Sequence, residues 1–278
     1  MYGAIIGDIV GSTHEFVNEK VDKGTFELLT VFNGYTDDTV MTIAVADALM
    51  SVSKDAPDEE IKAKVVEKMK LWGRRYFSVG YGPRFRKWIS DSTSEPYGSY
   101  GNGSAMRVSP VGWLYNDFDQ TRRIARLTAI VTHNHPEGIK GADAIASAIY
   151  LLRTTHSKGL IKDYISQNFG YNLDQSLDDI RNGDRHFVDC QHTVPEAIIS
   201  FLNGYNFEDV IRNAVSLGGD TDTIAAIAGS LAEAMYPIPR YLFNEIRGNL
   251  PYEMYPVMED FAVHRAMVNY MAGYSEAT

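Results

Sequence analysis

Apolar residues recur at spacings of three and four along most of the chain, the pattern of helices that bury one face. This periodicity predicts helices over Thr39–Ser51, Glu59–Tyr76, Gln120–Thr132, Gly141–Thr154, Lys162–Gln167, Pro195–Leu202, Phe207–Leu217, Thr223–Met235, Arg240–Asn249 and Val257–Met271. Alternation with a period of two, typical of strands, is scarce. We therefore predict an all-α protein.

The stretch Tyr2–Val10 is the one serious strand candidate. Gly3, Gly7 and Gly11 recur every four residues, so on a helix they would share one face and admit another helix at close range. A dinucleotide-binding strand and turn is the alternative, but the G-x-G-x-x-G spacing is missing and no strand–helix series follows. We predict a buried, closely packed helix.

Two polar segments, Ser78–Gly103 and Asp174–Gln191, show weak periodicity and are predicted to be loops. The first is rich in Gly, Ser, Tyr and Pro, and long ordered loops are disproportionately functional. No shift in composition marks a boundary, so we expect one domain over residues 1–278.

The composition is that of an ordinary globular protein, with 45% hydrophobic and 22% charged residues and a net charge of −10. The acidic balance makes a nucleic-acid partner unlikely and gives no reason to expect a membrane partner. One cysteine, Cys190, cannot form an internal disulfide, and no motif around it indicates a nucleophile. With no secretory signal pattern at the N-terminus, we expect a cytoplasmic location.

Two clusters of acids and hydroxyls precede predicted helices. They consist of Thr36, Asp37 and Asp38, and of Asp220, Asp222 and Thr223. Helix capping explains either cluster alone, since Asp and Thr are common N-cap residues. Together they supply more oxygen acceptors than the capping of two helix N-termini requires. Four carboxylates that met in space would repel one another unless protons or cations neutralised them, and all-oxygen ligands favour a hard ion such as Mg²⁺ or Mn²⁺.

Four blocks, in order along the chain, carry a family resemblance: "GAIIGDIVGSTHEF", "TDDT", "GNGSAMR" and "GGDTDT". In this order they resemble the ADP-ribosylglycohydrolase family, which includes the dinitrogenase-reductase-activating glycohydrolase and the ADP-ribosyl-arginine and ADP-ribosyl-serine hydrolases. The resemblance implies a single compact orthogonal helical bundle with two Mg²⁺ or Mn²⁺ ions in a cleft.

Residue by residue, the resemblance assigns metal binding to Thr36, Asp37, Asp38, Asp220, Asp222 and Thr223. It assigns catalysis to Glu15, with Asp37, Asp38 and Asp222 taking part. It assigns substrate binding to Asn102, Gly103, Ser104, Met106, His133 and Gly218. Asp8 lies in the first block, where helix packing or capping is at least as good an explanation as catalysis.

Some features near these motifs have open interpretations. Arg107 suits either a phosphate or an internal ion pair. His133 and His135 have a spacing that zinc ligands can have, but no further Cys or His cluster supports zinc. One aromatic ring of the Ser78–Gly103 segment, among Tyr81, Trp88, Tyr97 and Tyr100, is a candidate to stack on adenine.

The implied reaction is hydrolysis of the bond at C1″ of the distal ribose, which releases ADP-ribose from a small molecule or a modified protein. Two alternatives remain at this stage. One is an ADP-ribose-binding or structural protein of the same fold that has lost catalysis, and the other is a hydrolase of another phosphate-containing small molecule. The sequence leaves the acceptor group, the choice between Mg²⁺ and Mn²⁺ and the oligomeric state open.

Overall fold

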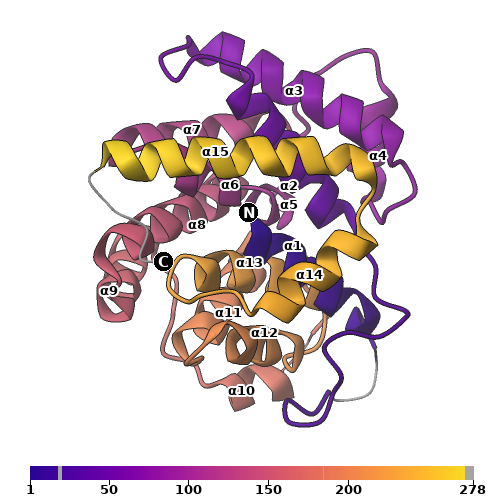
Figure 1. Ribbon diagram of the computed structural model, residues 1–278, viewed down its shortest axis with the longest axis vertical. Coiled ribbons are helices and arrows are strands. Elements are labelled where there is room, and N and C mark those ends of the chain that lie inside the picture. The colour runs from indigo at the N-terminus through magenta and orange to yellow at the C-terminus, as the bar shows by residue number, and fades with distance from the viewer. Residues whose placement is uncertain (18–20, 184, 273–278) are drawn as a thin grey trace.

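The computed structural model describes residues 1–17, 21–183 and 185–272, and the regular structure of these residues is helical (Figure 1). The α-helices are α1 (Tyr2–Gly11), α2 (Asp37–Met50), α3 (Asp58–Arg75), α4 (Pro83–Ser90), α5 (Gly103–Met106), α6 (Ser109–Leu114), α7 (Phe118–Ile130), α8 (Pro136–Thr155), α9 (Lys158–Phe169), α10 (Leu177–Asn182), α11 (Cys190–Leu202), α12 (Phe207–Val215), α13 (Thr221–Glu233), α14 (Arg240–Asn249) and α15 (Tyr255–Met271). Short 3₁₀ helices are η1 (Ser12–His14) and η2 (Tyr252–Met254). The β pairing in the described ranges is an isolated bridge between Gly101 and Asp189, so the predicted all-α class is confirmed.

Each helix predicted from periodicity is present, but some begin earlier than expected. Helix α11 begins at Cys190 instead of Pro195, because the Asp189 side chain accepts a hydrogen bond from the His192 backbone N–H at 3.1 Å and caps the helix there. Pro195 consequently lies inside the helix. Proline is common at helix starts, which made it a misleading boundary signal.

The two predicted loops were partly wrong. Helix α4 lies within the first segment, where Phe85, Trp88 and Ile89 share one face and are buried. Helix α10 lies within the second, and the Ser176 hydroxyl caps it by accepting from the Asp179 N–H at 3.1 Å. Both helices are short, so few periodic positions exist to distinguish them from a loop.

Helix α1 was correctly predicted as buried and closely packed: every residue from Gly3 to Gly11 is buried. It runs along α13, and the glycine face makes the contact. A Cβ added at Gly7 would lie 2.0 Å from the carbonyl oxygen of Ala225, and Gly3 and Gly11 are almost as tight against α13. Side chains at these positions would therefore force the two helices apart.

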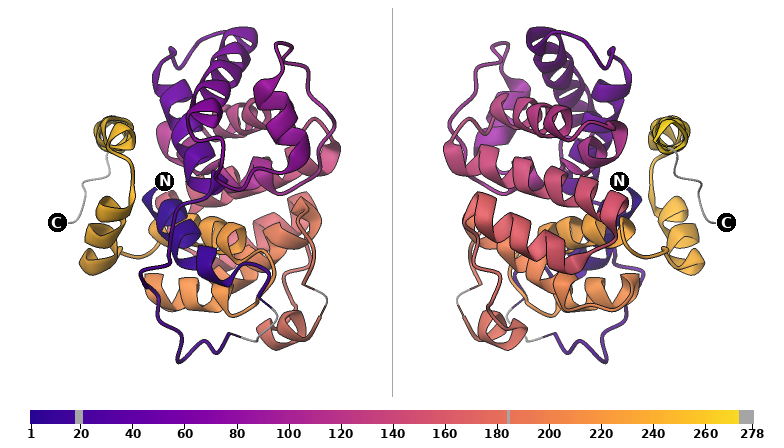
Figure 2. Two further views of the ribbon diagram at one scale, coloured as in Figure 1. Left: turned by 90° about the vertical axis from the view of Figure 1, so that its right-hand side faces the viewer. Right: turned by 90° about the vertical axis from the view of Figure 1, so that its left-hand side faces the viewer.

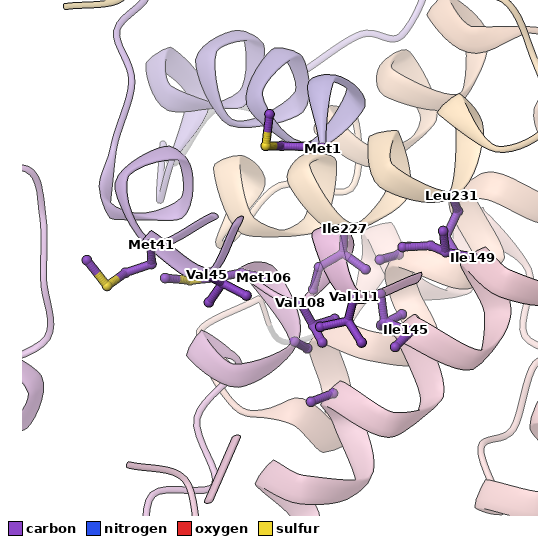
Figure 3. Close-up of a cluster of buried hydrophobic side chains, with 14 of the residues drawn as sticks. Met1, Met41, Val45, Met106, Val108, Val111, Ile145, Ile149, Ile227 and Leu231 are labelled. Carbon is purple, nitrogen blue, oxygen red and sulfur yellow. The ribbon is translucent and has the colours of Figure 1, made fainter. Parts of the chain in front are cut away.

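The hydrophobic core lies between α2, the α5–α6 segment, α8 and α13 (Figure 3). Met106, Val111, Ile145 and Ile227 meet there, and burial of such side chains supplies the main driving force for folding. Helices α14 and α15 pack on one side of the other helices (Figure 2). Within the described part of the chain, no helix combines the length and apolar character needed to span a membrane.

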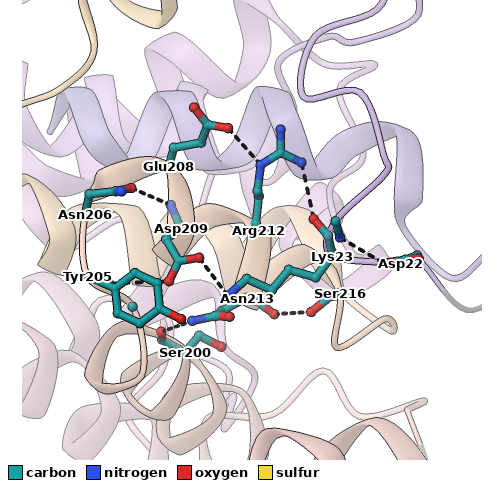
Figure 4. Close-up of polar contacts among 12 residues, drawn as sticks. Asp22, Lys23, Ser200, Tyr205, Asn206, Glu208, Asp209, Arg212, Asn213 and Ser216 are labelled. Carbon is teal, nitrogen blue, oxygen red and sulfur yellow. Dashed lines mark hydrogen bonds and ion pairs between the residues drawn. The ribbon is translucent and has the colours of Figure 1, made fainter.

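Part of the long connection from η1 to α2 is fastened to α12 (Figure 4). Arg212 donates hydrogen bonds to the carbonyl oxygens of Phe26 at 2.9 Å and Lys23 at 3.3 Å, and Glu208 accepts from its Nε at 2.8 Å. Lys23 in turn forms an ion pair with Asp209 at 2.7 Å. The connection is thus held against the body of the protein.

We expect Gly7→Ala to lower the free energy of unfolding by about 1–3 kcal/mol, because the added methyl group overlaps the α13 backbone. Urea denaturation followed by circular dichroism measures this. Gly159→Ala is the matched control, since Gly159 lies in helix α9 with open space around its Cβ position. The free energy of unfolding of Gly159→Ala should equal or exceed that of the wild type. Equal stability of the Gly7→Ala variant and the wild type would contradict the packing described.

Candidate functional site

A cavity of about 360 Å³ forms where the N-terminal ends of α2, α4, α5 and α13 converge. Helix N-termini carry partial positive charge and expose N–H groups, so this arrangement favours anionic groups. Ten residues predicted from the sequence line the cavity: Glu15, Asp37, Asp38, Asn102, Gly103, Met106, His133, Asp220, Asp222 and Thr223. Three further predicted residues, Thr36, Ser104 and Gly218, are not among the lining residues.

Asp8 caps α2 from the neighbouring helix α1. Its carboxylate accepts hydrogen bonds from the backbone N–H groups of Thr36 at 2.9 Å and Thr39 at 3.0 Å, and from both threonine hydroxyls. Asp8 on α1 thereby shares the capping of α2 with the N-cap residue Thr36, whose hydroxyl oxygen accepts from the Asp38 N–H at 3.3 Å. The carboxylates of Asp37 and Asp38 are therefore left free of the capping role.

The two acidic clusters meet in space. The Thr223 hydroxyl donates a hydrogen bond to Asp38 Oδ2 at 3.1 Å, a contact between residues 185 positions apart. The other oxygen, Asp38 Oδ1, is buried and has no hydrogen-bond partner among the described residues. A buried carboxylate oxygen without a partner carries a large desolvation cost, which a cation would relieve.

Glu15 joins the second cluster. Oxygen atoms of Glu15, Asp220 and Asp222 all lie within 4.8 Å of one another, close enough to bind one cation. Asn102 Nδ2 donates to Asp220 Oδ2 at 2.6 Å and so fixes the orientation of that carboxylate. Carboxylate and hydroxyl oxygens form a donor set suited to hard divalent ions.

The acids share a strongly perturbed electrostatic environment. Burial, followed by repulsion from Asp222, raises the pKa of Asp37 to about 8 and that of Glu15 to about 7. Burial raises the pKa of Asp220 to about 6, and burial with neighbouring carboxylates raises the pKa values of Asp38 and Asp222 well above their usual range. The described ion pairs include no lysine or arginine bound to any of the five. These ion pairs therefore give the acidic cluster no compensating positive charge, which a cation bound from solution would supply.

Glycines shape the loop before α13. Gly218 and Gly219 have φ values of +73° and +77°, which glycine adopts without strain. The Gly219 carbonyl oxygen accepts a hydrogen bond from the Phe16 N–H at 2.7 Å, which ties the residue after Glu15 to this loop. Gly218 thus has a conformational role beside the cavity instead of a place in its wall.

Another wall of the cavity is basic and aromatic. Of the four candidate rings, Tyr97 lines the cavity, whereas Tyr81 and Trp88 are buried elsewhere and Tyr100 contacts His135. The guanidinium of Arg84 lies 4.9 Å from the centre of the Tyr97 ring. The Arg84 guanidinium therefore lies over the Tyr97 ring, and the centre of the His133 ring is 6.1 Å from that of Tyr97.

The cavity residues that the sequence analysis missed include Gly80, Arg84 and Val188. Gly80 has a φ of +107°, and a Cβ there would lie 3.1 Å from Asp37 Oδ1. Its neighbourhood, "GYGP", carries an ordinary turn signal that says nothing about the acids. The place of Gly80 and Arg84 depends on how the Ser78–Gly103 segment folds back over α2, whereas Val188 comes from the second segment, just before α11.

The structure also describes the surroundings of Cys190 and of the two neighbouring histidines, His133 and His135. Burial raises the pKa of Cys190 to about 12, so its thiol carries almost no thiolate at neutral pH. His135 is exposed and caps α8 by accepting from the Glu137 N–H at 3.2 Å, whereas His133 is buried at the cavity. The two side chains therefore lie in different surroundings.

Comparisons with known proteins agree with this geometry. A family model described as ADP-ribosylglycohydrolase matches residues 1–271. Human ADP-ribosylhydrolase ARH3 is 27% identical over 84% of this chain and 83% of its own. The ADP-ribosylarginine hydrolase Tri1 of Pseudomonas putida is 29% identical over 86% of this chain and 70% of its own. A solved structure titled "ADP-ribosylglycohydrolase-related protein complex" shares the fold, with a TM-score of 0.67 and 22% identity over 96% of this chain and 94% of that one.

In a chelating buffer, we expect the melting temperature to fall as the pH rises through the raised pKa values of Asp220, Glu15 and Asp37, about 6, 7 and 8. A carboxyl group with a raised pKa binds its proton more tightly in the folded state, so its stabilisation is lost as the pH rises through that value. Differential scanning fluorimetry across this range measures the effect.

The matched variant is Asp222→Asn, which removes one charge from the cluster and should make the pH dependence shallower. Addition of Mg²⁺ or Mn²⁺ to the wild type should restore the melting temperature at the high end of the range, because a ligand that binds only the folded state stabilises it. A melting temperature that stays level or rises with pH in chelator would contradict the electrostatic description.

Proposed function

The chain belongs to the ADP-ribosylglycohydrolase family, and on that premise we propose that it hydrolyses the bond between C1″ of an ADP-ribosyl group and its acceptor, releasing ADP-ribose. The observation that supports this most directly is the convergence of five carboxylates on one cavity with no basic partner among the described residues. Such a cluster is costly to bury and is typical of a functional site.

The ligands that we propose for two Mg²⁺ or Mn²⁺ ions are Asp37, Asp38, Asp220, Asp222 and Thr223, with Thr36 as the sixth residue of the predicted set. The unpartnered Asp38 Oδ1 and the oxygen-only donor set fit hard cations. The Thr36 hydroxyl already donates to Asp8 at 2.7 Å, so it is the least available of the six. When bound, the cations supply Lewis acidity and neutralise the carboxylates.

Glu15 is the residue that we propose to exchange a proton at the scissile bond. It lies at the exposed rim of the cavity, beside Asp220 and Asp222, where water and the acceptor group can both reach it. Burial, followed by repulsion from Asp222, raises the pKa of Glu15 to about 7 in the metal-free chain, and cations that neutralise Asp222 would lower it from there. We propose Glu15 for this role on its position at the rim, within reach of a proton donor or acceptor. Cleavage of a glycosidic bond at C1″ proceeds through an oxocarbenium-like state, and proton transfer to the leaving group assists it.

The remaining walls of the cavity are proposed to bind the rest of ADP-ribose. Gly101 and Gly103 carry no side chains, so a diphosphate can approach their backbone closely. Asn102 holds Asp220 in place through its 2.6 Å hydrogen bond and connects this loop to the acids. Tyr97 is the one of the four predicted rings that lines this cavity, where Phe16 and Phe85 also lie, and we propose it for adenine.

We expect Asp38→Asn and Asp222→Asn to lower the rate of ADP-ribose release by about a thousandfold or more, because the cation sites supply several kcal/mol of transition-state stabilisation. The fold should survive, since each change also relieves repulsion between buried carboxylates. The measurement is release of ADP-ribose from ADP-ribosyl-arginine, ADP-ribosyl-serine and acetyl-ester substrates with Mg²⁺ or Mn²⁺.

Asp178→Asn is the control, because Asp178 is an exposed acid paired with Arg181 on α10, away from the cavity. Its activity should match the wild type. Full activity in chelator, or in Asp222→Asn, would reject the proposal. Binding of ADP-ribose without turnover of any substrate would identify a binding protein of the same fold instead.

A further inference from the structure

His133 lies at the end of α7 with its ring against the glycine-rich loop of the cavity. Its backbone N–H donates to the Ala129 carbonyl oxygen at 2.8 Å, and its side chain is buried. Nε2 lies 3.1 Å from the point that a Cβ on Gly103 would occupy, and 3.8 Å from the corresponding point on Gly101. This nitrogen therefore faces the loop over which a ligand would lie.

The other ring nitrogen is engaged from behind. Thr132 Oγ1 lies 2.8 Å from His133 Nδ1, and Arg107 Nη2 donates to the same hydroxyl oxygen at 2.9 Å. Arg107 also donates to the Thr128 carbonyl oxygen at 3.1 Å and is 1% exposed. No carboxylate pairs with this guanidinium among the described ion pairs, so its role is not explained by charge neutralisation.

The direction of this chain of hydrogen bonds follows from the donors available. Arginine has no acceptor atom, so the Thr132 oxygen must accept from Arg107. The one hydroxyl proton of Thr132 then donates to His133 Nδ1, so the hydroxyl group of Thr132 and the Nδ1 atom of His133 both have partners. In the reverse arrangement Nδ1 would carry the proton, and the hydroxyl proton of fully buried Thr132 would have no acceptor among the described hydrogen bonds.

The charge of the ring agrees with this direction. Burial, followed by the neighbouring guanidinium groups of Arg107 and Arg84, lowers the pKa of His133 well below its usual value. The ring is therefore neutral at physiological pH and carries a single proton.

We propose that Arg107 and Thr132 are positioning residues that hold His133 as the tautomer protonated on Nε2, so that it presents an N–H donor to an oxygen atom of a ligand lying over Gly101 and Gly103. The tautomer follows from the protein alone. That the ligand is ADP-ribose rests on the function proposed above. The buried arginine thus fixes the polarity of a hydrogen bond donated into the cavity.

The test uses Thr132→Val, which keeps the side-chain shape and removes the hydroxyl. Nitrogen-15 NMR of the histidine rings reports which nitrogen is protonated, with the His133 signals assigned by their loss in His133→Gln. We expect the wild type to show protonation at Nε2 and Thr132→Val to show a mixture of tautomers. Calorimetry with ADP-ribose should show binding weakened roughly three- to tenfold, the usual effect of one hydrogen bond.

Three further variants separate positioning from simple loss of packing. Thr132→Ser restores a hydroxyl and should restore both the tautomer and the affinity. Thr121→Val removes a buried hydroxyl from helix α7, which ends two residues before Thr132. That hydroxyl donates to the Asp117 carbonyl oxygen at 2.8 Å, and its loss should change neither the tautomer nor the affinity. Arg107→Met should behave as Thr132→Val does, and where it fails to fold, Thr132→Val alone decides.

The outcomes are distinct. A wild-type His133 protonated at Nδ1, or a Thr132→Val variant with unchanged tautomer and affinity, overturns the inference. A wild type that shows the expected tautomer but does not bind ADP-ribose overturns the proposed function and the ligand part of the inference, while the tautomer assignment stands. Loss of the Nε2 tautomer and of affinity in Thr132→Val, with recovery of both in Thr132→Ser, supports the inference.

Discussion

The close contact between α1 and α13 is the constraint on which the site depends. Because three glycines allow the two backbones to touch, the acids carried by each helix are brought to the same level of the bundle. Asp8 on α1 can then cap α2, while Asp222 at the start of α13 faces the acids of α2. A wider spacing between α1 and α13 would both remove the Asp8 cap from α2 and separate the acids of α2 from Asp222.

The site is built from charges that oppose folding. Five carboxylates gather where burial and mutual repulsion both disfavour ionisation, and their cost is offset by the apolar core beneath them. Capping by Asp8 leaves Asp37 and Asp38 available, so structure and chemistry are assigned to different carboxylates. On the opposite wall, Arg107 uses its donors to orient a neutral side chain. The cavity therefore has one wall that attracts cations and another that donates hydrogen bonds.

Much of the fold and most of the predicted lining of the cavity could be predicted from the sequence. The parts that could not be predicted have identifiable physical reasons. The family resemblance and the all-α class are confirmed, since both rest on long periodic segments and four ordered motifs. The spacing of Gly3, Gly7 and Gly11 predicted the close contact of α1. Helix α4 and the contributions of Gly80 and Arg84 were missed, because their position is set by how a segment folds back over distant residues. The local sequence around these residues does not indicate that they lie beside the distant acids. The roles of the site residues stay predictions.

The hydrogen bond from Thr223 to Asp38 also has a kinetic consequence, because it joins parts of the chain 185 residues apart. Contacts between residues so far apart in the chain form late in folding. They form after other contacts have offset the entropic cost of closing the intervening loop. A chain still emerging from the ribosome would lack α13, and with it half of the acidic cluster. Capture of a divalent ion would therefore mark the completed molecule, and would slow its opening without helping its earliest folding steps.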